Sequence, residues 1–237
     1  CSSDVPNEAL DVIDHVTRRY EPGHSADLTL SGFYQKMLKR RTSGFVLELH
    51  DGTVASKQVG PEFHTPRVFI VRALDTFRVK SCIDFKVWDT EEYYLNIVKL
   101  IGCWSYVGQV FANGQNLSIG AGCESHGVVE HEILHALGFY HEQSRYDRDD
   151  YVDIVFNNIK TGQEHNFRKV GSDESSTHGT PYDYFSVMHY NKDAFTNGNG
   201  STIITIDPKY QDVIGQRLDM SPLDVQELNL LYKCGKR

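Results

Sequence analysis

Three histidines and one glutamate lie within eleven residues of this chain, at spacings that suit a single metal ion. Residues 131–141 read HEILHALGFYH. His131 and His135 are four positions apart, so on a helix they would lie on one face, one turn apart. Both imidazoles could then reach a common point about 2 Å away, which is the usual zinc–nitrogen distance. This spacing predicts zinc-assisted hydrolysis as the chemistry of the chain.

His141 can join the other two histidines only if the helix ends before it. It follows His135 by six residues, and a continued helix would turn it away from the ligand face. Gly138 is placed to end the helix, because glycine adopts the left-handed conformation without a steric penalty. Three neutral imidazoles leave the remaining coordination of zinc open to water, as in catalytic sites. We therefore expect one zinc ion per chain, held by His131, His135 and His141.

Glu132 adjoins the first ligand without sharing its direction, and we expect it to act as the general base. Zinc lowers the pKa of water toward neutrality, and a nearby carboxylate can accept the proton and later deliver it to a leaving amine. The H-E-x-x-H string alone also occurs on solvated helix faces. The five fixed positions together, however, would arise by chance in roughly one such chain in ten thousand.

A second string extends the pattern toward one family of zinc enzymes. Residues 186–190 read SVMHY, and Glu142 directly follows the third histidine. With the histidine string, they resemble the astacin family of metzincin zinc endopeptidases, from about Arg67 to Cys234. Further segments agree with that family, namely 82–85 (CIDF), 102–104 (GCW), 117–120 (LSIG), 141–151 (HEQSRYDRDDY) and 214–217 (IGQR).

The resemblance implies an α+β fold of the metzincin type, with two lobes. A twisted sheet and the active-site helix would form the N-terminal lobe, and a mostly irregular C-terminal lobe would end in a helix. Hydrophobic periodicity and capping residues predict the same order of elements. The predicted helices are 67–80, 127–138, 151–167 and one that starts at Ser221-Pro222, and the predicted strands are 83–88, 94–100 and 117–120.

Three residues of the second string receive roles from the resemblance. Tyr190 would be an additional zinc ligand in the resting enzyme and would then stabilise the oxyanion, a role that suits a phenol near a metal. From the sequence alone, a core or surface tyrosine is the default interpretation. Met188 would form an apolar floor beneath the metal. His189 is interpreted as structural, since the first string already supplies three imidazoles.

The resemblance also indicates where a substrate would bind. Residues 117–120 would form an edge strand that pairs with an extended peptide, and an ordinary strand is an equal alternative. Arg217 would line the pocket just after the scissile bond and favour acidic side chains; the alternative is a surface arginine in a loop. The candidate substrate-binding residues are Leu117, Ser118, Ile119, Gly120 and Arg217.

The first forty residues differ in composition from the remainder and are interpreted as a pro-segment of a zymogen. They include a possible amphipathic helix at 25–40, and the basic run 39–41 offers a cleavage site. Residues 41–237 would then be the catalytic domain. The F-x-G-D string of family pro-segments does not occur, and the nearest candidate for an aspartate switch is Asp51. An ordinary N-terminal arm remains the alternative.

Composition limits the possible partners and compartment. The formal net charge of −8 argues against nucleic acid and against an anionic membrane surface. No apolar run is long enough to span a membrane. Five cysteines and two N-x-S sequons favour a secreted, extracellular protein. Their spacing leaves the pairing open; the family resemblance implies the disulfides Cys82–Cys234 and Cys103–Cys123, which leaves Cys1 over.

These observations predict a secreted zinc metalloendopeptidase that cleaves internal bonds of extended protein or peptide substrates. Two rivals stay open. One is a catalytically inactive binding or structural protein of the same fold, although such a copy would be expected to lose Glu132 or a ligand. The other is a zinc hydrolase for small molecules, which a closed pocket would favour. The sequence does not name the substrate or the oligomeric state.

Overall fold

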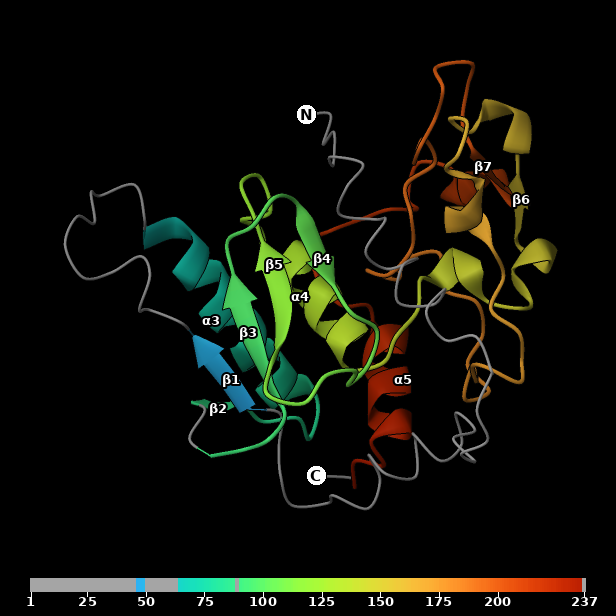
Figure 1. Cartoon of the computed structure of the whole chain (residues 1–237). Coiled ribbons are helices and arrows are strands. Elements are labelled where there is room, and N and C mark those ends of the chain that lie inside the picture. Colours follow the sequence, from blue (N-terminus) through green and yellow to red (C-terminus); the bar gives the residue numbers. More distant parts are fainter. Residues whose placement is uncertain (1–45, 50–63, 88–89, 236–237) are drawn as a thin grey trace, which may run out of the picture.

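The N-terminal lobe is built on a five-stranded sheet (Figure 1). The computed structural model describes residues 46–49, 64–87 and 90–235. The predictions for the pro-segment, Asp51 and Cys1 lie outside these residues. The strands are β1 (Val46–Leu49), β2 (Lys86–Val87), β3 (Tyr94–Val98), β4 (Cys103–Ser105) and β5 (Gln115–Ile119). Their spatial order is β2-β1-β3-β5-β4, and only β4 runs antiparallel to its neighbour.

The strand that contains Leu117 is not at the edge of the sheet. β5 pairs with β3 on one side and with β4 on the other, so the prediction of an edge strand at 117–120 is wrong. The cause is the turn at Gly102 (φ 79°), which brings Cys103 opposite Ile119. A disulfide then joins Cys103 to Cys123 just beyond β5. Among the described strands, β4 therefore forms the outer edge on this side.

Two helices cover one face of this sheet and form the main core with it. They are α3 (His64–Lys80) and α4 (His126–Ala136), which lie behind the strands in Figure 1. β3 and β5 turn Leu95 and Leu117 toward the helices, where both side chains are buried with Phe77 of α3 and Ile133 of α4. The predicted helix 67–80, the strand near 94–100 and the active-site helix are confirmed, and the strand predicted at 83–88 is described only at 86–87.

The C-terminal lobe consists mostly of turns and short 3-10 helices. Its sheet pairs β6 (Val152–Ile154) with β7 (Ile203–Thr205). The helix predicted at 151–167 is therefore wrong: its start is a strand, and Gly162 (φ 88°) interrupts the remainder. The 3-10 helices are η2 (Glu142–Ser144), η3 (Arg148–Asp150), η4 (Phe156–Asn158), η5 (Glu164–Phe167) and η6 (Pro208–Tyr210).

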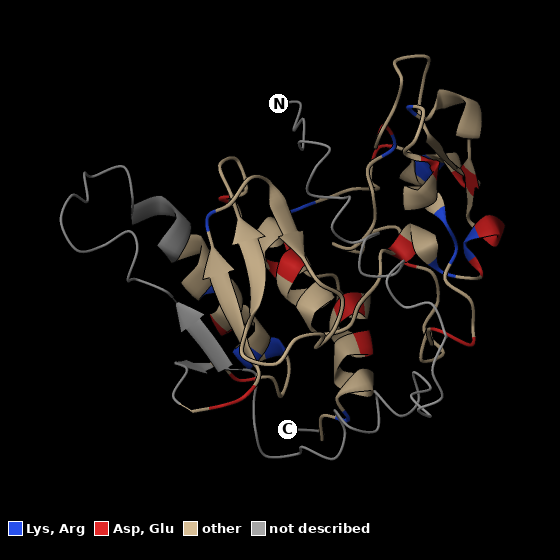
Figure 2. Cartoon of the chain, in the orientation of Figure 1, with Lys and Arg blue, Asp and Glu red and all other residues tan. Residues whose placement is uncertain are grey.

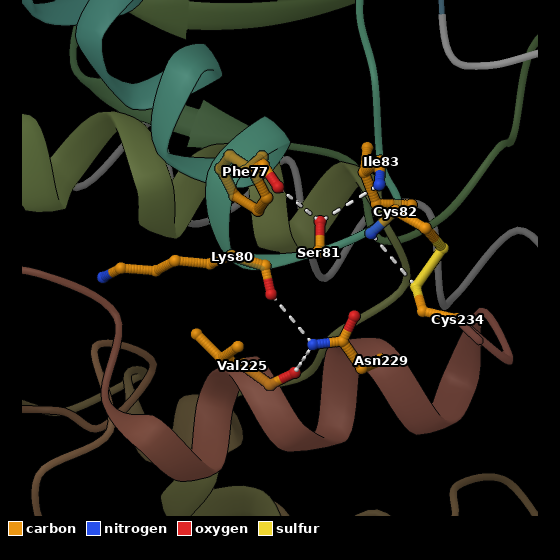
Figure 3. The surroundings of a disulfide bond; sticks show 8 residues. All are labelled: Phe77, Lys80, Ser81, Cys82, Ile83, Val225, Asn229 and Cys234. Carbon is orange, nitrogen blue, oxygen red and sulfur yellow. Dashed lines mark hydrogen bonds between the residues drawn. A yellow bond between two sulfur atoms is a disulfide. The ribbon is translucent and has the colours of Figure 1, made fainter. Parts of the chain in front are cut away.

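The last helix, α5 (Pro222–Leu231), returns the chain to the first lobe. It begins as predicted, with Pro222 in the first turn and Ser221 as the cap. Leu228 is fully buried in the main core. A disulfide joins Cys82, just after α3, to Cys234, just after α5 (Figure 3). The C-terminal helix is therefore fixed to the first lobe. The molecule has an α+β fold with two lobes, as expected.

Charged residues lie mainly on the helices and on the second lobe. Figure 2 shows β3, β4 and β5 without Lys, Arg, Asp or Glu, whereas acidic residues mark α4, α5 and the turns of the second lobe. No described helix is both long and apolar enough to cross a membrane.

Candidate metal centre

The first two histidines of the string extend from one face of α4 into the interior. His131 and His135 are 7% and 1% exposed, and their Nε2 atoms lie 3.1 Å apart. The helix is buried over nearly all its length because its apolar residues pack on the sheet while the histidine face meets the second lobe. The four-residue spacing therefore places both imidazoles at one point, as the sequence predicts.

His141 reaches the same point because the helix ends where expected. Gly138 takes a left-handed conformation (φ 103°), and its N–H and that of Phe139 bond back to the last turn of the helix. The chain then turns, and His141 is extended (φ −67°, ψ 144°). Its Nε2 lies 3.1 Å from that of His135. Three Nε2 atoms on a tetrahedral zinc ion would be about 3.3 Å apart, so the three imidazoles fit one such ion.

Backbone carbonyl groups orient two of the three rings. His131 Nδ1 lies 2.8 Å from the Val187 oxygen, and His135 Nδ1 lies 2.7 Å from the Phe139 oxygen. Each Nδ1 therefore carries the proton and donates it, and each Nε2 presents a lone pair to the centre. Burial lowers the pKa of His135 to about 4 and holds the pKa values of His131 and His141 well below the usual value. The rings are thus neutral, as metal ligands must be.

Glu132 presents an unsatisfied carboxylate oxygen beside the three imidazoles. The residue is 4% exposed, and its Oε2 has no hydrogen-bond partner among the described residues. Burial raises its pKa to about 8, and the nearby Arg217 opposes this shift. A buried polar atom without a partner is costly. A polar ligand or an ion at the centre would relieve this cost, so the donor set and the orphan oxygen both fit a metal with bound water.

Arg217 is half-buried, and its charge acts on the three histidines and on Glu132. One terminal nitrogen, Nη1, donates to the carbonyl oxygens of His189 and Gln216, each at 2.9 Å. Burial lowers its pKa, against the favourable charge interactions with Glu132 and Tyr190. The guanidinium is therefore held near the reacting groups by the turn that carries Tyr190.

That turn, residues 186–190, lies where the two cores of the molecule meet. Met188 is buried in the core of the first lobe, and Tyr190 is buried in the core of the second. The ring centres of Tyr190 and His141 are 4.3 Å apart. The two nitrogens of His189 contact the Tyr182 hydroxyl and the Tyr190 carbonyl oxygen, each at 2.7 Å. This geometry supports the interpretation of His189 as structural.

The residues that hold this turn in place were not predicted from the sequence. Asp224 of α5 accepts hydrogen bonds from the Ser186 hydroxyl (2.6 Å) and the Val187 N–H (2.9 Å). Gln143 accepts from the Tyr190 N–H at 2.9 Å. The carbonyl oxygen of Val187 in turn accepts a hydrogen bond from His131. Asp224 of α5 is thus linked to His131 through Val187, by one hydrogen bond on each side of that residue. The sequence indicates that Ser221 caps α5, but it does not indicate that Asp224 also binds the turn at 186–190.

Glu142 lies behind the centre, as expected for a structural residue. Its Oε1 accepts from the Asp183 N–H at 2.8 Å and lies 3.3 Å from Arg145 Nη1. Arg145 also pairs with Asp147 and contacts Glu227 at 3.5 Å. Burial, opposed by Arg145, raises the pKa of Glu142.

Comparison with known proteins identifies the family of this chain. The family model for astacin, a peptidase family, matches residues 62–233. The chain belongs to the astacin family. It is therefore a domain of the zinc metallopeptidase class, as the histidine string predicted.

Individual relatives agree with this membership. Meprin A subunit beta of Rattus norvegicus is 53% identical over 165 residues, which are 70% of this chain and 23% of that protein. Zinc metalloproteinase nas-6 of Caenorhabditis elegans is 38% identical over 185 residues, 78% of this chain and 54% of that protein. The chain thus spans about a quarter of the length of the meprin subunits that it matches.

A solved structure has the same fold. High choriolytic enzyme 1, a hatching enzyme zinc-protease from Oryzias latipes, superposes with a TM-score of 0.70 at 35% identity. The match covers 83% of this chain and 92% of that chain. The α+β astacin fold predicted from the sequence is confirmed.

Proposed function

We propose that this astacin domain is the catalytic domain of a secreted zinc endopeptidase that cleaves extended polypeptides. The observation that carries the proposal is the meeting of three neutral imidazoles, in which His135 Nε2 lies 3.1 Å from the Nε2 atoms of His131 and His141, together with the unpartnered Oε2 of the adjacent Glu132. His131, His135 and His141 would hold one zinc ion per chain. Bound there, zinc supplies a Lewis acid that acidifies water and polarises the scissile carbonyl group.

Glu132 acts as the general base. Its carboxylate accepts the proton of the attacking water and passes it to the amine that leaves. Burial raises the pKa of Glu132 in the metal-free site, and the double positive charge of a bound zinc ion would lower it again, so that the carboxylate could accept a proton. The positive charge of Arg217 also lowers the pKa of Glu132.

Tyr190 supports the oxyanion that forms when water attacks the carbonyl group. Its ring lies 4.3 Å from that of His141, centre to centre, and its hydroxyl interacts electrostatically with Glu132 and Arg217. It would bind the metal in the resting state and donate a hydrogen bond once negative charge develops. Burial keeps its pKa above the usual value, so the phenol retains the proton that it donates.

The substrate pairs with β4 rather than with residues 117–120. The outer edge of β4 faces no other described strand, and the segment after it contacts the ligand helix through a hydrogen bond from the Gly108 N–H to the His135 oxygen (2.8 Å). An extended peptide added to this edge would pass beside the metal. In this arrangement, the inner edge of β4 pairs with β5, and the hydrogen bonds to β4 and to the turn before it come from Leu117, Ser118, Ile119 and Gly120.

Arg217 selects the residue just after the scissile bond. Its hydrogen bonds to the described residues leave from Nη1, and a guanidinium with free N–H groups binds carboxylates well. An acidic side chain at this substrate position would complete its contacts. The protein therefore favours substrates with Asp or Glu there.

The secretory compartment is supported by two disulfides, Cys82–Cys234 and Cys103–Cys123. Residues 1–40 would be a pro-segment and 41–237 the catalytic domain.

Cleavage-site profiling tests the proposal. The wild-type protein is incubated with a denatured proteome, beside Glu132→Ala and with a chelator. We expect cleavage in the wild type only, with Asp or Glu enriched after the cut, and loss of this enrichment in Arg217→Gln. No cleavage by zinc-loaded wild type would favour an inactive binding protein, and hydrolysis of small esters alone would favour the small-molecule hydrolase.

A further inference from the structure

A second group of metal-ligating side chains lies on another face of α4. His126 begins the helix, Glu130 lies one turn later, and Asp219 approaches from the segment before α5. His126 Nε2 is 2.9 Å from Glu130 Oε1 and 3.8 Å from Asp219 Oδ1. One donor atom from each residue falls within 4.8 Å of the other two, as in the histidine triad.

The buried side chain of Glu130 contributes one carboxylate oxygen, Oε1, to this group of three residues. Its side chain is 0% exposed, and its Oε2 accepts a hydrogen bond from the Met220 N–H at 2.8 Å. Its Oε1 lies 2.9 Å from His126 Nε2 without good hydrogen-bond geometry, and its carboxyl group also interacts with that of Asp219. Two carboxyl groups that face each other in a buried place repel unless a cation or a shared proton lies between them. The Oε1 atom is therefore an available donor that faces the other two side chains.

The group is reached from solvent along α3. A groove of about 540 Å³ is lined by Thr76, Lys80, His126 and Asp219, among others. Thr76 Oγ1 lies 3.3 Å from His126 Nε2. Lys80 Nζ lies 2.6 Å from Asp219 Oδ1, so an ammonium group already balances part of the acidic charge. A bound cation would have to displace this ammonium or leave it on the other oxygen of Asp219.

We propose that His126, Glu130 and Asp219 form a second binding site for a divalent first-row metal ion such as zinc. One imidazole and two carboxylates are ligands that zinc accepts, and water would complete its coordination. Calcium and magnesium prefer more oxygen ligands and no imidazole. The site is separate from the catalytic centre, because the helical period directs its two donors on α4 to a different side from the histidine ligands.

Occupancy of this site would fix the segment that carries Arg217. The ion would join Glu130 of α4 to Asp219, two residues beyond Arg217. This segment already packs closely on α4, since a Cβ atom at Gly127 would lie only 2.3 Å from the Arg217 oxygen. A second metal would therefore add a bond between the ligand helix and the wall of the proposed substrate pocket.

Zinc stoichiometry at saturation tests the proposal. The full chain is equilibrated with buffered zinc, and elemental analysis and calorimetric titration count the ions. We expect two equivalents in the wild type and one in His126→Gln and in Asp219→Asn, with the first equivalent unchanged. Thermal unfolding that stays cooperative shows that each variant is folded.

Two further variants sharpen the result. Lys80→Met removes the competing ammonium and should tighten the second equivalent by about tenfold or more, because like charges a few ångströms apart repel. His178→Asn removes an exposed histidine elsewhere and should change neither equivalent. A single equivalent in the wild type, or a second one that persists in His126→Gln, would overturn the proposal. Loss of the first equivalent would instead count against the triad.

Discussion

Burial governs the protonation of the groups at the candidate metal centre. It lowers the pKa of His135 to about 4 and raises the pKa of Glu132 to about 8. These shifts have opposite signs because burial disfavours the charged form of each group. Neutral imidazoles present lone pairs, and a carboxyl group near its titration point can exchange a proton. The same physical cause therefore acts on both the proposed ligands and the proposed base.

The Tyr190 hydroxyl can be tested by removing it alone. We expect Tyr190→Phe to bind zinc with the same stoichiometry and to lower kcat by about 100-fold, as for loss of one oxyanion donor. KM should change little, because the interaction forms only in the transition state. Steady-state kinetics on a fluorogenic peptide measure both constants. A variant with an unchanged kcat would show that the tyrosine only packs.

The buried carboxyl group of Glu132 predicts a pH dependence of stability for the metal-free protein. Its pKa is about 8 when folded, against 4.5 when unfolded. The folded state thus binds the proton more tightly, so the stabilisation is complete below pH 4.5 and is lost as pH rises to 8. Relative to Glu132→Gln, the wild type should lose up to about 1 kcal/mol per pH unit in this window.

Urea denaturation of both chelated proteins across this pH window measures the difference. Subtracting the two free energies of unfolding cancels the contribution of the titratable groups that both proteins share. Parallel stability curves would show that the carboxyl group is not buried without a partner.

At the scale of elements, local sequence signals were sufficient to locate the ends of α4 and α5, although they also predicted a helix at 151–167 that does not form. Gly138 ends α4 and Ser221 caps α5, and both signals need only a few neighbouring residues. The strands depended on distant partners. Residues 152–154 read as helical, yet they pair with β7 far along the chain, and β5 became central only because β4 folds back along it. The histidine string was likewise local, whereas the role of Asp224 needs the fold.

The cap of α5 should have a measurable effect on stability. The Ser221 hydroxyl accepts from the N–H groups of Leu223 and Asp224 and contacts Asp183. Ser221→Ala should lower the free energy of unfolding by about 1–2 kcal/mol. Ser172→Ala, at an exposed loop position, should stay within about 0.5 kcal/mol of wild type. Chemical denaturation measures both; equal stabilities would contradict the cap.

At the scale of the whole molecule, the metal centre depends on the return of the chain from the second lobe to the first. The three histidines come from the ligand helix and the turn after it, but Val187 and Tyr190 arrive from the second lobe. α5 then binds that turn through Asp224 and packs Leu228 into the first core. The closure of the chain by α5 therefore holds the two lobes around the centre.

The disulfide Cys82–Cys234 strengthens this closure and should matter more than Cys103–Cys123. It closes a loop with a sequence separation of 152, against 20 for the other pair. Loop entropy predicts a loss of about 5 kcal/mol when both of its cysteines become serine and about 3 kcal/mol for the shorter loop.

The protein should nevertheless fold without this disulfide, because Asn229 of α5 donates to the Lys80 oxygen at 3.0 Å and to the Val225 oxygen at 2.8 Å (Figure 3). The buried apolar face of α5 adds to this contact. Denaturation of Cys82→Ser/Cys234→Ser beside Cys103→Ser/Cys123→Ser tests the ranking. If the shorter loop proved the more important, local support of β4 rather than closure by α5 would govern the stability of the molecule.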